Sequence, residues 1–487
     1  MRRFLFGAAR HLSLAILYGA AGAIIVLVAG FVVQLESRPD LKVWHEAELD
    51  LEFTVENPVL SFPGYVALEE RLFAQVDEQV FARIQPVDRR LINRYHRGSL
   101  SDPDRWSPNW NRTFEFTSDT PRAGVLLLHG MSDSPYSLSH VGQRLHAAGA
   151  WVIGLRLPGH GTAPSGLVEL RWQDMAAAVE LAMRHLRDRL GDRPIYLVGY
   201  SNGAALAVHY ALSALGDQTL PPASGLVLIS PAIGVTRLAV LAEWQARLGY
   251  VLGLHKLAWN SILPEYDPFK YGSFAVNAGA QVYRLTAEIQ SLLNMLGASG
   301  DLDRFPPVLA FQSAVDATVS TRAVVQNLFD KLPAGGHELV LFDINRYTEV
   351  ERILREDPKA GIEAMLSSGD LPFTVCLVTN ESEKSHHVIA RRKVPGGGAI
   401  SEIFIGMRWP RGLYSLSHVS LPFPATDRLY GGPDSGTSPG IQLGNIELRG
   451  ERGVLQIPAS DMLRLRWNPF YPYLEQRLFE FMDLEEP

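Results

Sequence analysis

Cysteine is nearly absent from this sequence, and Cys376 is the only one among 487 residues. A single cysteine excludes an internal disulfide and any metal site built from several cysteines, and we interpret Cys376 as a small buried apolar residue. An excess of basic residues is missing too, since 45 Lys and Arg stand against 52 Asp and Glu for a formal net charge of -7. Nucleic-acid binding normally needs a basic surface, so no nucleic-acid partner is expected.

Clusters with metal-ligand spacing and glycine-rich phosphate-binding loops are also missing, so no metal or organic cofactor is expected. What the chain does have is the composition of an average globular protein, 47% hydrophobic and 20% charged. Its length exceeds the usual size of one compact domain, which predicts a core with insertions.

Charged residues are missing from the segment between Arg10 and Glu36. Residues 12–35 are almost wholly apolar, and a bilayer-spanning helix needs about 20 such residues. Because arginines precede this run and acidic residues follow it, the positive-inside rule predicts a cytoplasmic N-terminus and an outward-facing remainder. A cleaved signal peptide is the alternative, although its apolar region normally has only about 7 to 15 residues. We therefore predict one transmembrane helix within residues 1–36.

The rest of the chain divides into a helical segment and a larger alternating region. Residues 66–97 have apolar positions three and four apart, with Pro86 as a break, which predicts a largely helical packing segment. From Arg112 onward, short apolar runs alternate with helical stretches, a pattern typical of an α/β domain with a mainly parallel sheet covered on both faces. The predicted strands are Gly124–Leu128, Ala150–Leu155, Ile195–Gly199, Gly225–Ser230, Val308–Gln312 and Glu338–Phe342.

The strongest motif is Gly199-Tyr200-Ser201-Asn202-Gly203, between an apolar strand and a helix rich in small residues. This context favours a nucleophile elbow, a turn so tight that the flanking positions must be glycine and the serine hydroxyl stands above the sheet edge. The pattern alone is weak evidence in a chain with 42 glycines, and its position between strand and helix carries the argument. We predict Ser201 as the nucleophile.

Two further loops carry motifs that resemble those of a known protein family. The strand GVLLL runs into His129-Gly130-Met131, and a second loop contains LPGHG. Through LLLHGMSDSPYS, LRLPGHGTAPSGL and LVGYSNGAA, roughly residues 112–345 resemble the α/β-hydrolase superfamily, in its serine aminopeptidase-like branch with monoacylglycerol lipases and carboxylesterases. The resemblance implies an oxyanion hole formed by the backbone amides of Met131 and Asn202. We interpret His129 and His160 as structural.

The resemblance also implies a triad in the chain order Ser, acid, His, with the acid in a turn after a late strand. Asp316 occupies that place, after the strand PVLAFQS, whereas Asp301 and Asp303 precede the strand and lie at its wrong end. The following segment, ELVLFD, is expected to be the last core strand. We therefore predict Asp316 as the acid.

The histidine departs from the family pattern, because none follows ELVLFD closely. An insertion at about residues 346–400 accounts for this. His386 and His387 lie in a charged stretch typical of an exposed hairpin, while His418 lies in YSLSHVSLPFPATD, whose Ser, Pro and Asp residues favour an anchored irregular loop. His337 precedes a strand, at the end away from the site. We predict His418 as the base, with His386 and His387 as alternatives.

The predicted protein is thus an α/β hydrolase with a helical cap, an insertion before the catalytic histidine and one transmembrane helix. The predicted parts are an anchor at 1–36, a linker and packing segment at 37–111, a core at 112–231 and 301–487, and a cap at 232–300. Aromatic residues in the cap favour a hydrophobic ester, and the anchor favours a lipid-like one.

The predicted function is that of a serine hydrolase cleaving a carboxylic ester, of the monoacylglycerol lipase or carboxylesterase type. The alternatives are a thioesterase, peptidase or acyltransferase on the same triad, or a non-catalytic membrane-tethered binding protein. If the chain is bacterial, the anchor would place the catalytic domain on the periplasmic side of the inner membrane.

Overall fold

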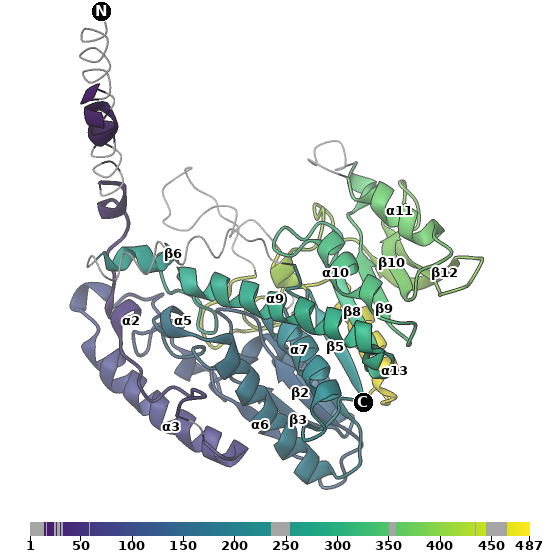
Figure 1. The fold of residues 1–487 in the computed structure, drawn as a ribbon, viewed down its shortest axis with the longest axis horizontal. Helices are drawn as coiled ribbons and strands as arrows, with labels where there is room; N and C mark the ends of the chain where they lie inside the picture. Colours follow the sequence, from purple (N-terminus) through teal and green to yellow (C-terminus); the bar gives the residue numbers. More distant parts are fainter. Residues whose placement is uncertain are drawn as a thin grey trace, which may run out of the picture.

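A ten-stranded sheet forms the centre of the protein (Figure 1). The computed structural model describes residues 14–57 with gaps between 16 and 32, then 59–234, 254–349, 357–433, 435–444 and 465–487. Within these residues the strand order is β1-β3-β2-β4-β5-β8-β9-β10-β11-β12.

The strands from β3 to β10 in this order run parallel to one another, while β1, β11 and β12 are antiparallel to their neighbours. The strands are β1 Phe114–Phe116, β2 Gly124–Leu128, β3 Trp151–Leu155, β4 Ile195–Tyr200, β5 Gly225–Ile229, β8 Val308–Ser313, β9 Glu338–Phe342, β10 Thr374–Asn380, β11 His387–Lys393 and β12 Ser401–Arg408. All six predicted strands are present, each within one residue at either end. The predicted α/β fold with a mainly parallel sheet is confirmed.

Helices cover both faces of this sheet, which explains why its central strands are continuously apolar. Leu126 and Leu128 of β2 join a buried cluster with α6, α7 and α9, whereas Val125 and Leu127 join a cluster with α4 and α13 on the opposite face. The helices are α2 Val43–Glu46, α3 Phe62–Gln79, α4 Ser139–Ala147, α5 Gly166–Glu169, α6 Trp172–Leu190, α7 Asn202–Gly216, α9 Val276–Ser299, α10 Thr321–Asn327, α11 Lys359–Ser367 and α13 Tyr471–Met482.

The sheet does not end where the sequence predicts. β9 was expected to be the last core strand, but β10 pairs with it in parallel, and β11 and β12 follow as antiparallel strands. The prediction was wrong because TVCLVTN in β10 is itself a buried strand, packed against α11 on one face and α13 on the other. Cys376 on β10 is buried as predicted, with its Sγ 3.3 Å from the Tyr473 hydroxyl.

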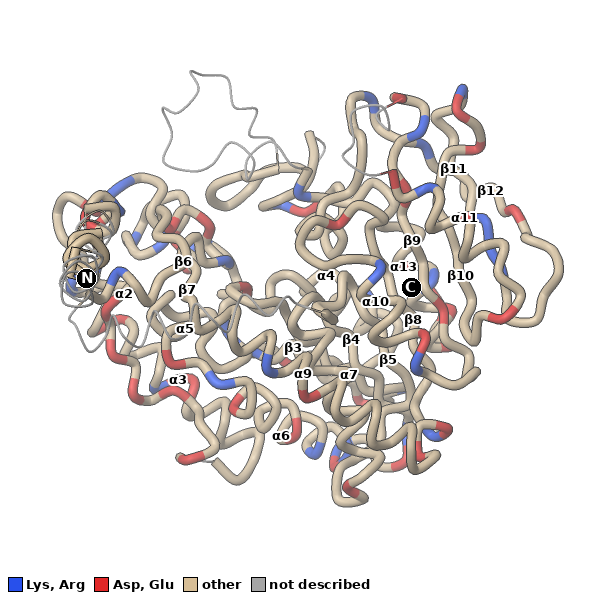
Figure 2. Tube along the Cα trace, turned by 45° about the horizontal axis from the view of Figure 1, so that its top comes forward, with Lys and Arg blue, Asp and Glu red and all other residues tan. Residues whose placement is uncertain are grey.

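The predicted insertion is therefore an extension of the sheet, formed by α11 and β10 to β12. β12 ends at Arg408, beyond the predicted end near Ile400. Basic and acidic residues are interspersed along this extension (Figure 2), and Arg391 pairs with both Glu363 and Glu402.

The segment at residues 66–97 is less helical than predicted. α3 ends at Gln79, and only the short 3₁₀ turns Phe81–Arg83 and Pro86–Asp88 follow it. α3 starts earlier than predicted, where the Ser61 hydroxyl accepts a hydrogen bond from the Gly64 N–H and caps the helix.

The predicted cap also differs from the structure. Residues 235–253, with the aromatic residues Trp244 and Tyr250, lie outside the described residues. The helix α9 packs against α6 and α7 in the layer that covers the sheet, so it is part of the core. Residues 254–275 are mostly irregular, with one 3₁₀ turn and the two short strands β6 Trp259–Ser261 and β7 Phe274–Ala275.

The predicted transmembrane segment at residues 12–35 lies in large part outside the described residues. Among the helices that the structure describes, none has both the length and the apolar character needed to span a bilayer. The anchor stays a prediction from the sequence.

Candidate active site

Ser201 lies in a tight turn between β4 and α7. Its φ of 53° is unusual for a residue with a side chain, and it marks the strained geometry that lifts a serine above the sheet. Both flanking glycines are sterically required, because a Cβ on Gly199 would lie 2.4 Å from the Cα of Ala204, and one on Gly203 would lie 2.0 Å from the carbonyl oxygen of Leu128. Only glycine fits at these two positions, so the turn depends on both glycines.

The structure brings the three predicted triad side chains together. The Nε2 atom of His418 lies 3.0 Å from the Ser201 hydroxyl, and its Nδ1 atom lies 2.8 Å from a carboxylate oxygen of Asp316. The His418 side chain is 7% exposed and that of Asp316 is fully buried. Since the ionised carboxylate can only accept, Nδ1–H donates to Asp316 and Nε2 is left to accept the Ser201 proton.

Asp316 is oriented by the turn that follows β8. Its Oδ1 accepts hydrogen bonds from the backbone N–H groups of Thr318 and Val319 at 2.7 and 2.9 Å. The amide of Gln312 donates to Oδ2 at 3.2 Å, beside the bond from His418. Sequence reasoning missed Gln312 as a positioning residue, although its place at the end of the same strand was a usable signal. Four donors thus hold the carboxylate in one orientation.

His418 begins a 3₁₀ turn, Ser417 is its N-terminal neighbour, and the surrounding loop is fixed by bonds to other elements. The Ser313 hydroxyl of β8 donates to the carbonyl of Leu416 at 2.8 Å, and the Ser417 hydroxyl donates to that of Leu465 at 2.7 Å. The Tyr200 hydroxyl donates to the carbonyl of His418 at 3.4 Å. The loop is irregular and well anchored, as predicted for it.

The two alternative histidines lie elsewhere. His387 begins β11, with its ring 5.7 Å from that of Phe404, and the ring of His386 is 3.6 Å from that of Tyr347. Both therefore lie on the sheet extension, and the Ser201 hydroxyl bonds to His418 instead.

The loop after β2 approaches Ser201 closely. A Cβ on Gly130 would lie 3.3 Å from the Cβ of Ser201, which puts the next residue, Met131, beside the nucleophile. Among the described residues, the backbone N–H groups of Met131 and Asn202 donate to no other group. These two amides are available to a substrate oxygen.

His129 and His160 have structural contacts. The Nε2 atom of His129 accepts the Leu157 N–H at 3.0 Å, so its Nδ1–H donates to the Gly130 carbonyl at 2.9 Å. Burial lowers the pKa of His129 well below its usual value and that of His160 to about 4, so both rings are neutral. Both rings bond to the backbone of the two loops, and the Ser201 hydroxyl bonds to His418.

A buried ion cluster joins the segment before the core to the second of these loops. Arg156 donates to Glu69 and to both carboxylate oxygens of Glu52, each at 2.9 Å, and also to the carbonyl of His160 at 3.0 Å. Residues 37–111 therefore do more than link, because they supply the carboxylates that neutralise a fully buried arginine.

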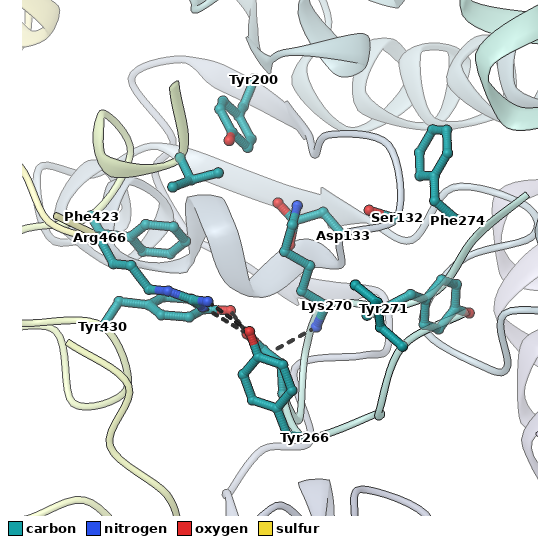
Figure 3. Close-up of a pocket in the computed structure, with 14 residues that line it drawn as sticks. Ser132, Asp133, Tyr200, Tyr266, Lys270, Tyr271, Phe274, Phe423, Tyr430 and Arg466 are labelled. Carbon is teal, nitrogen blue, oxygen red and sulfur yellow. Dashed lines mark hydrogen bonds and ion pairs between the residues drawn. The ribbon is translucent and has the colours of Figure 1, made fainter. Parts of the chain in front are cut away.

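A cavity of about 180 Å³ opens beside the site, lined by Tyr200, Ser132, Asp133 and Val419, which are neighbours of the predicted site residues (Figure 3). The prediction of an apolar lining holds for only part of this cavity. Phe274 and Phe423 line the cavity, but so do the charged side chains of Lys270, Asp267 and Arg466, and the tyrosines Tyr266, Tyr271 and Tyr430. No sequence motif marked these polar residues.

No group of three or more His, Cys, Asp or Glu side chains in the described part of the chain is arranged to hold a metal ion. The chemistry available from the described residues is that of a serine hydroxyl beside an imidazole oriented by a carboxylate.

Comparisons with known proteins show what the chain is similar to. The family model of serine aminopeptidase, S33, matches residues 119–345. A thermostable monoacylglycerol lipase of Bacillus sp. (strain H-257) is 29% identical over 124 residues, which cover 26% of this chain and 46% of that protein. The aligned part is thus less than half of the lipase.

Among solved structures, the metagenome-derived lipolytic enzymes LipS and LipT give a TM-score of 0.36 at 21% identity, covering 50% of this chain and 96% of that chain. The Paleococcus ferrophilus monoacylglycerol lipase gives a TM-score of 0.36 at 18% identity, covering 47% and 88%. The matched family region contains Ser201 and Asp316 but ends before His418. Residues 119–345, just under half of the chain, are therefore similar to the serine aminopeptidase S33 family.

Proposed function

We propose that the protein is a serine hydrolase that cleaves carboxylic esters, with Ser201, His418 and Asp316 as its catalytic triad. The observation that carries this proposal is the continuous chain of hydrogen bonds from the Ser201 hydroxyl through both nitrogens of His418 to Asp316. This arrangement is the one that nucleophilic acyl transfer needs, because the base lies within reach of the nucleophile and a carboxylate sets its tautomer.

In the first step, Ser201 Oγ attacks the ester carbonyl carbon while His418 Nε2 takes the hydroxyl proton. The carbonyl oxygen becomes an oxyanion, which the N–H groups of Met131 and Asn202 stabilise. Losing one such donor costs about 3 to 4 kcal/mol in other hydrolases. His418 then gives its proton to the leaving alcohol as the carbon–oxygen bond breaks, and the acyl group stays on Ser201.

In the second step, a water molecule attacks the acyl carbon and His418 takes its proton. The carbon–oxygen bond to Ser201 breaks, the proton returns to Ser201 Oγ, and the carboxylic acid leaves. Asp316 stabilises the charged imidazolium in both steps and itself stays ionised.

The proposed substrate class is a lipid-like ester. The similarity to a protein named as a monoacylglycerol lipase supports it, as do the phenylalanines that line the cavity. The apolar run at residues 12–35 supports a membrane anchor that would keep the enzyme near lipid, with its catalytic domain outside and the N-terminus in the cytoplasm.

The anchor can be tested by expressing the full chain with a reporter at its C-terminus and separating membranes with an alkaline carbonate wash. Retention in the membrane and reporter activity outside the cytoplasm are expected. Release by the wash, or a mature chain that starts after residue 36, would contradict the anchor.

The triad proposal is tested on the full chain in detergent with a series of p-nitrophenyl esters of increasing acyl length. The wild type should hydrolyse them and react with a fluorophosphonate probe, whereas Ser201→Ala should lose about a millionfold in kcat and all labelling. Hydrolysis that survives in a purified, folded Ser201→Ala variant would refute Ser201 as the nucleophile. If the rate of hydrolysis did not change with acyl length, the lipid-like substrate class would be refuted, while the proposed ester hydrolysis would stand.

A further inference from the structure

Within the described part of the chain, Lys270 puts a cation without an ion-pair partner into the cavity beside the proposed nucleophile. Its side chain is only partly exposed and lies next to Asp133 in the middle of the cavity (Figure 3). Its backbone N–H donates to Asp267, but among the described residues its ammonium group has neither a hydrogen bond nor an ion pair. A partly buried charge without a partner is costly, so this group favours an anion that enters from outside.

The other charges of the cavity are already paired. Oδ1 of Asp267 accepts the N–H groups of Phe269 and Lys270 at 3.0 and 3.1 Å, and Oδ2 accepts the Tyr430 hydroxyl at 2.5 Å. Arg466 completes the cluster, with one nitrogen 3.4 Å from Asp267 and the other 2.8 Å from the Tyr266 hydroxyl. The arginine and Asp267 thus neutralise each other.

Asp133 lies near Lys270 and attracts it, but no hydrogen bond or ion pair joins the two side chains. Its Oδ1 accepts the Ser134 N–H at 2.9 Å, so part of its hydrogen-bonding capacity is used by its own turn. Burial raises the pKa of Asp133 to about 6 in spite of the nearby lysine, so this carboxylate is ionised at neutral pH only at a cost in stability. Because the ammonium group of Lys270 has no hydrogen bond or ion pair within the described residues, it is open to a ligand.

The segment that carries this cation is bonded to the loop beside the proposed nucleophile. The N–H of Tyr271, the next residue, donates to the carbonyl of Ser132 at 2.8 Å, and Ser132 follows the proposed oxyanion residue Met131. The cavity wall also includes Tyr200 and Val419, the neighbours of Ser201 and His418 in sequence. The cavity thus borders the segments that carry Ser201 and His418, so a substrate whose ester lies on Ser201 can extend into it.

We propose that this cavity is an anion subsite, in which Lys270 binds a carboxylate or phosphate carried by the ester substrate. The inference rests on the proposed ester hydrolysis and narrows its substrate class to anionic esters. The shared chemistry is an oxyanion a few bonds from the scissile carbonyl, on either the acyl or the alcohol side.

The test compares two matched pairs of esters on the full-length protein in detergent. On the acyl side, the p-nitrophenyl monoester of glutaric acid is compared with its neutral methyl diester, after subtraction of spontaneous hydrolysis. On the alcohol side, a 1-acylglycerol 3-phosphate is compared with the 1-acylglycerol of the same chain. A charge-assisted hydrogen bond predicts that kcat/KM for the anionic member is about tenfold higher in one of the pairs. The preferred pair identifies which side of the ester carries the anion.

Lys270→Met should abolish this preference, and Lys270→Arg should keep most of it. Lys359→Met is the matched control, because it removes the same charge from an exposed helix end where Lys359 pairs with Glu383. The control should leave the anionic-to-neutral ratio as in the wild type. Equal rates within both pairs, or an unchanged ratio in Lys270→Met, would overturn the subsite.

A binding measurement separates this inference from the proposed reaction. Calorimetry with the Ser201→Ala variant should show binding of at least one of the two anionic esters, and this binding should weaken about tenfold when Lys270→Met is added. Binding that depends on Lys270 without any hydrolysis by the wild type would keep the subsite and refute the esterase. Hydrolysis of neutral esters, together with binding of anionic esters that does not depend on Lys270, would keep the esterase and refute the subsite.

Discussion

The two halves of the active site are positioned in different ways. Ser201 is placed by its nearest neighbours in sequence, because a strand, two obligatory glycines and a helix start determine its turn. His418 is placed by groups far away in sequence, since the loop around it is tied to Ser313 and Leu465. The first half depends on local sterics and the second on a few long-range hydrogen bonds.

This difference shows how the site tolerates a large addition before its histidine. Between β9 and His418 the chain adds α11 and three strands. It then returns to the end of β9, where Asn345 donates hydrogen bonds to the carbonyls of Tyr414 and Leu413 at 2.7 and 2.8 Å. Because the loop is fixed at its anchor points, the length of chain between them is free to vary.

The largest effect on kcat is expected for His418, which links Ser201 to Asp316. His418→Ala removes the proposed base and should lower kcat for a p-nitrophenyl ester by about a millionfold. His386→Ala and His387→Ala are the controls, and both should keep wild-type kcat because these rings lie on the sheet extension. A His418→Ala variant with wild-type turnover would show that the second half of the site is assigned wrongly.

A steric change tests the local half. Gly203→Ala would put a Cβ 2.0 Å from the Leu128 carbonyl oxygen and 2.6 Å from that of His129, both backbone atoms that can move only by opening the turn. We expect a loss of about 3 kcal/mol in the free energy of unfolding, measured in urea, together with loss of esterase activity.

Gly216→Ala at the other end of α7 is the matched control. No atom lies within 4 Å of its added Cβ, so the change should shift stability by no more than about 1 kcal/mol. If both variants had the unfolding midpoint of the wild type, the close approach of Gly203 to β2 would be disproved.

The same contrast explains what the sequence could predict. The six strands and the turn at Ser201 follow from local patterns, namely continuous apolar runs and glycines at a fixed spacing. Asp316 follows from its place after β8. β10 was missed because one more buried strand after β9 has no local signal that separates it from an insertion, and α9 was read as cap because an amphipathic pattern does not reveal which surface it packs on.

The polar cavity was beyond prediction for a related reason. Lys270, Asp267 and Arg466 come from distant segments without a shared motif, and only the fold brings them together. Of the aromatic residues assigned to the cap, Tyr266, Tyr271 and Phe274 line this cavity, but the charges among them were not expected.

Asp133, in the loop after β2 that lines this cavity, makes the free energy of unfolding depend on pH. Burial raises the pKa of Asp133 from 3.8 to about 6, so the folded state holds this proton to a higher pH than the unfolded state does. Stability from this group is therefore complete below about pH 4 and is lost as the pH rises through about 6. Asp133→Asn should remove this loss and raise the free energy of unfolding by about 2 to 3 kcal/mol at pH 8.

Urea unfolding of wild type and Asp133→Asn at pH 4 and pH 8 measures this effect. The difference between them should be large at pH 8 and close to zero at pH 4. Asp370→Asn, on an exposed loop, controls for the loss of one negative charge and should show no such trend. A difference that is the same at both pH values would mean that Asp133 is charged in the fold without cost.

The smallest predicted effect isolates the anchoring of the distant half. Ser313→Ala removes the 2.8 Å hydrogen bond to the Leu416 carbonyl and leaves that carbonyl unpaired beside a fully buried position, at a cost of about 1 kcal/mol. Because this bond holds the loop of His418, kcat should also fall several-fold with KM unchanged. Ser61→Ala, which removes the cap of α3 at a similar cost of about 1 kcal/mol, is the control and should leave kcat unchanged. If the two variants lost stability equally and neither lost kcat, His418 would be held by the remaining bonds alone, and the distant half would be as robust as the local one.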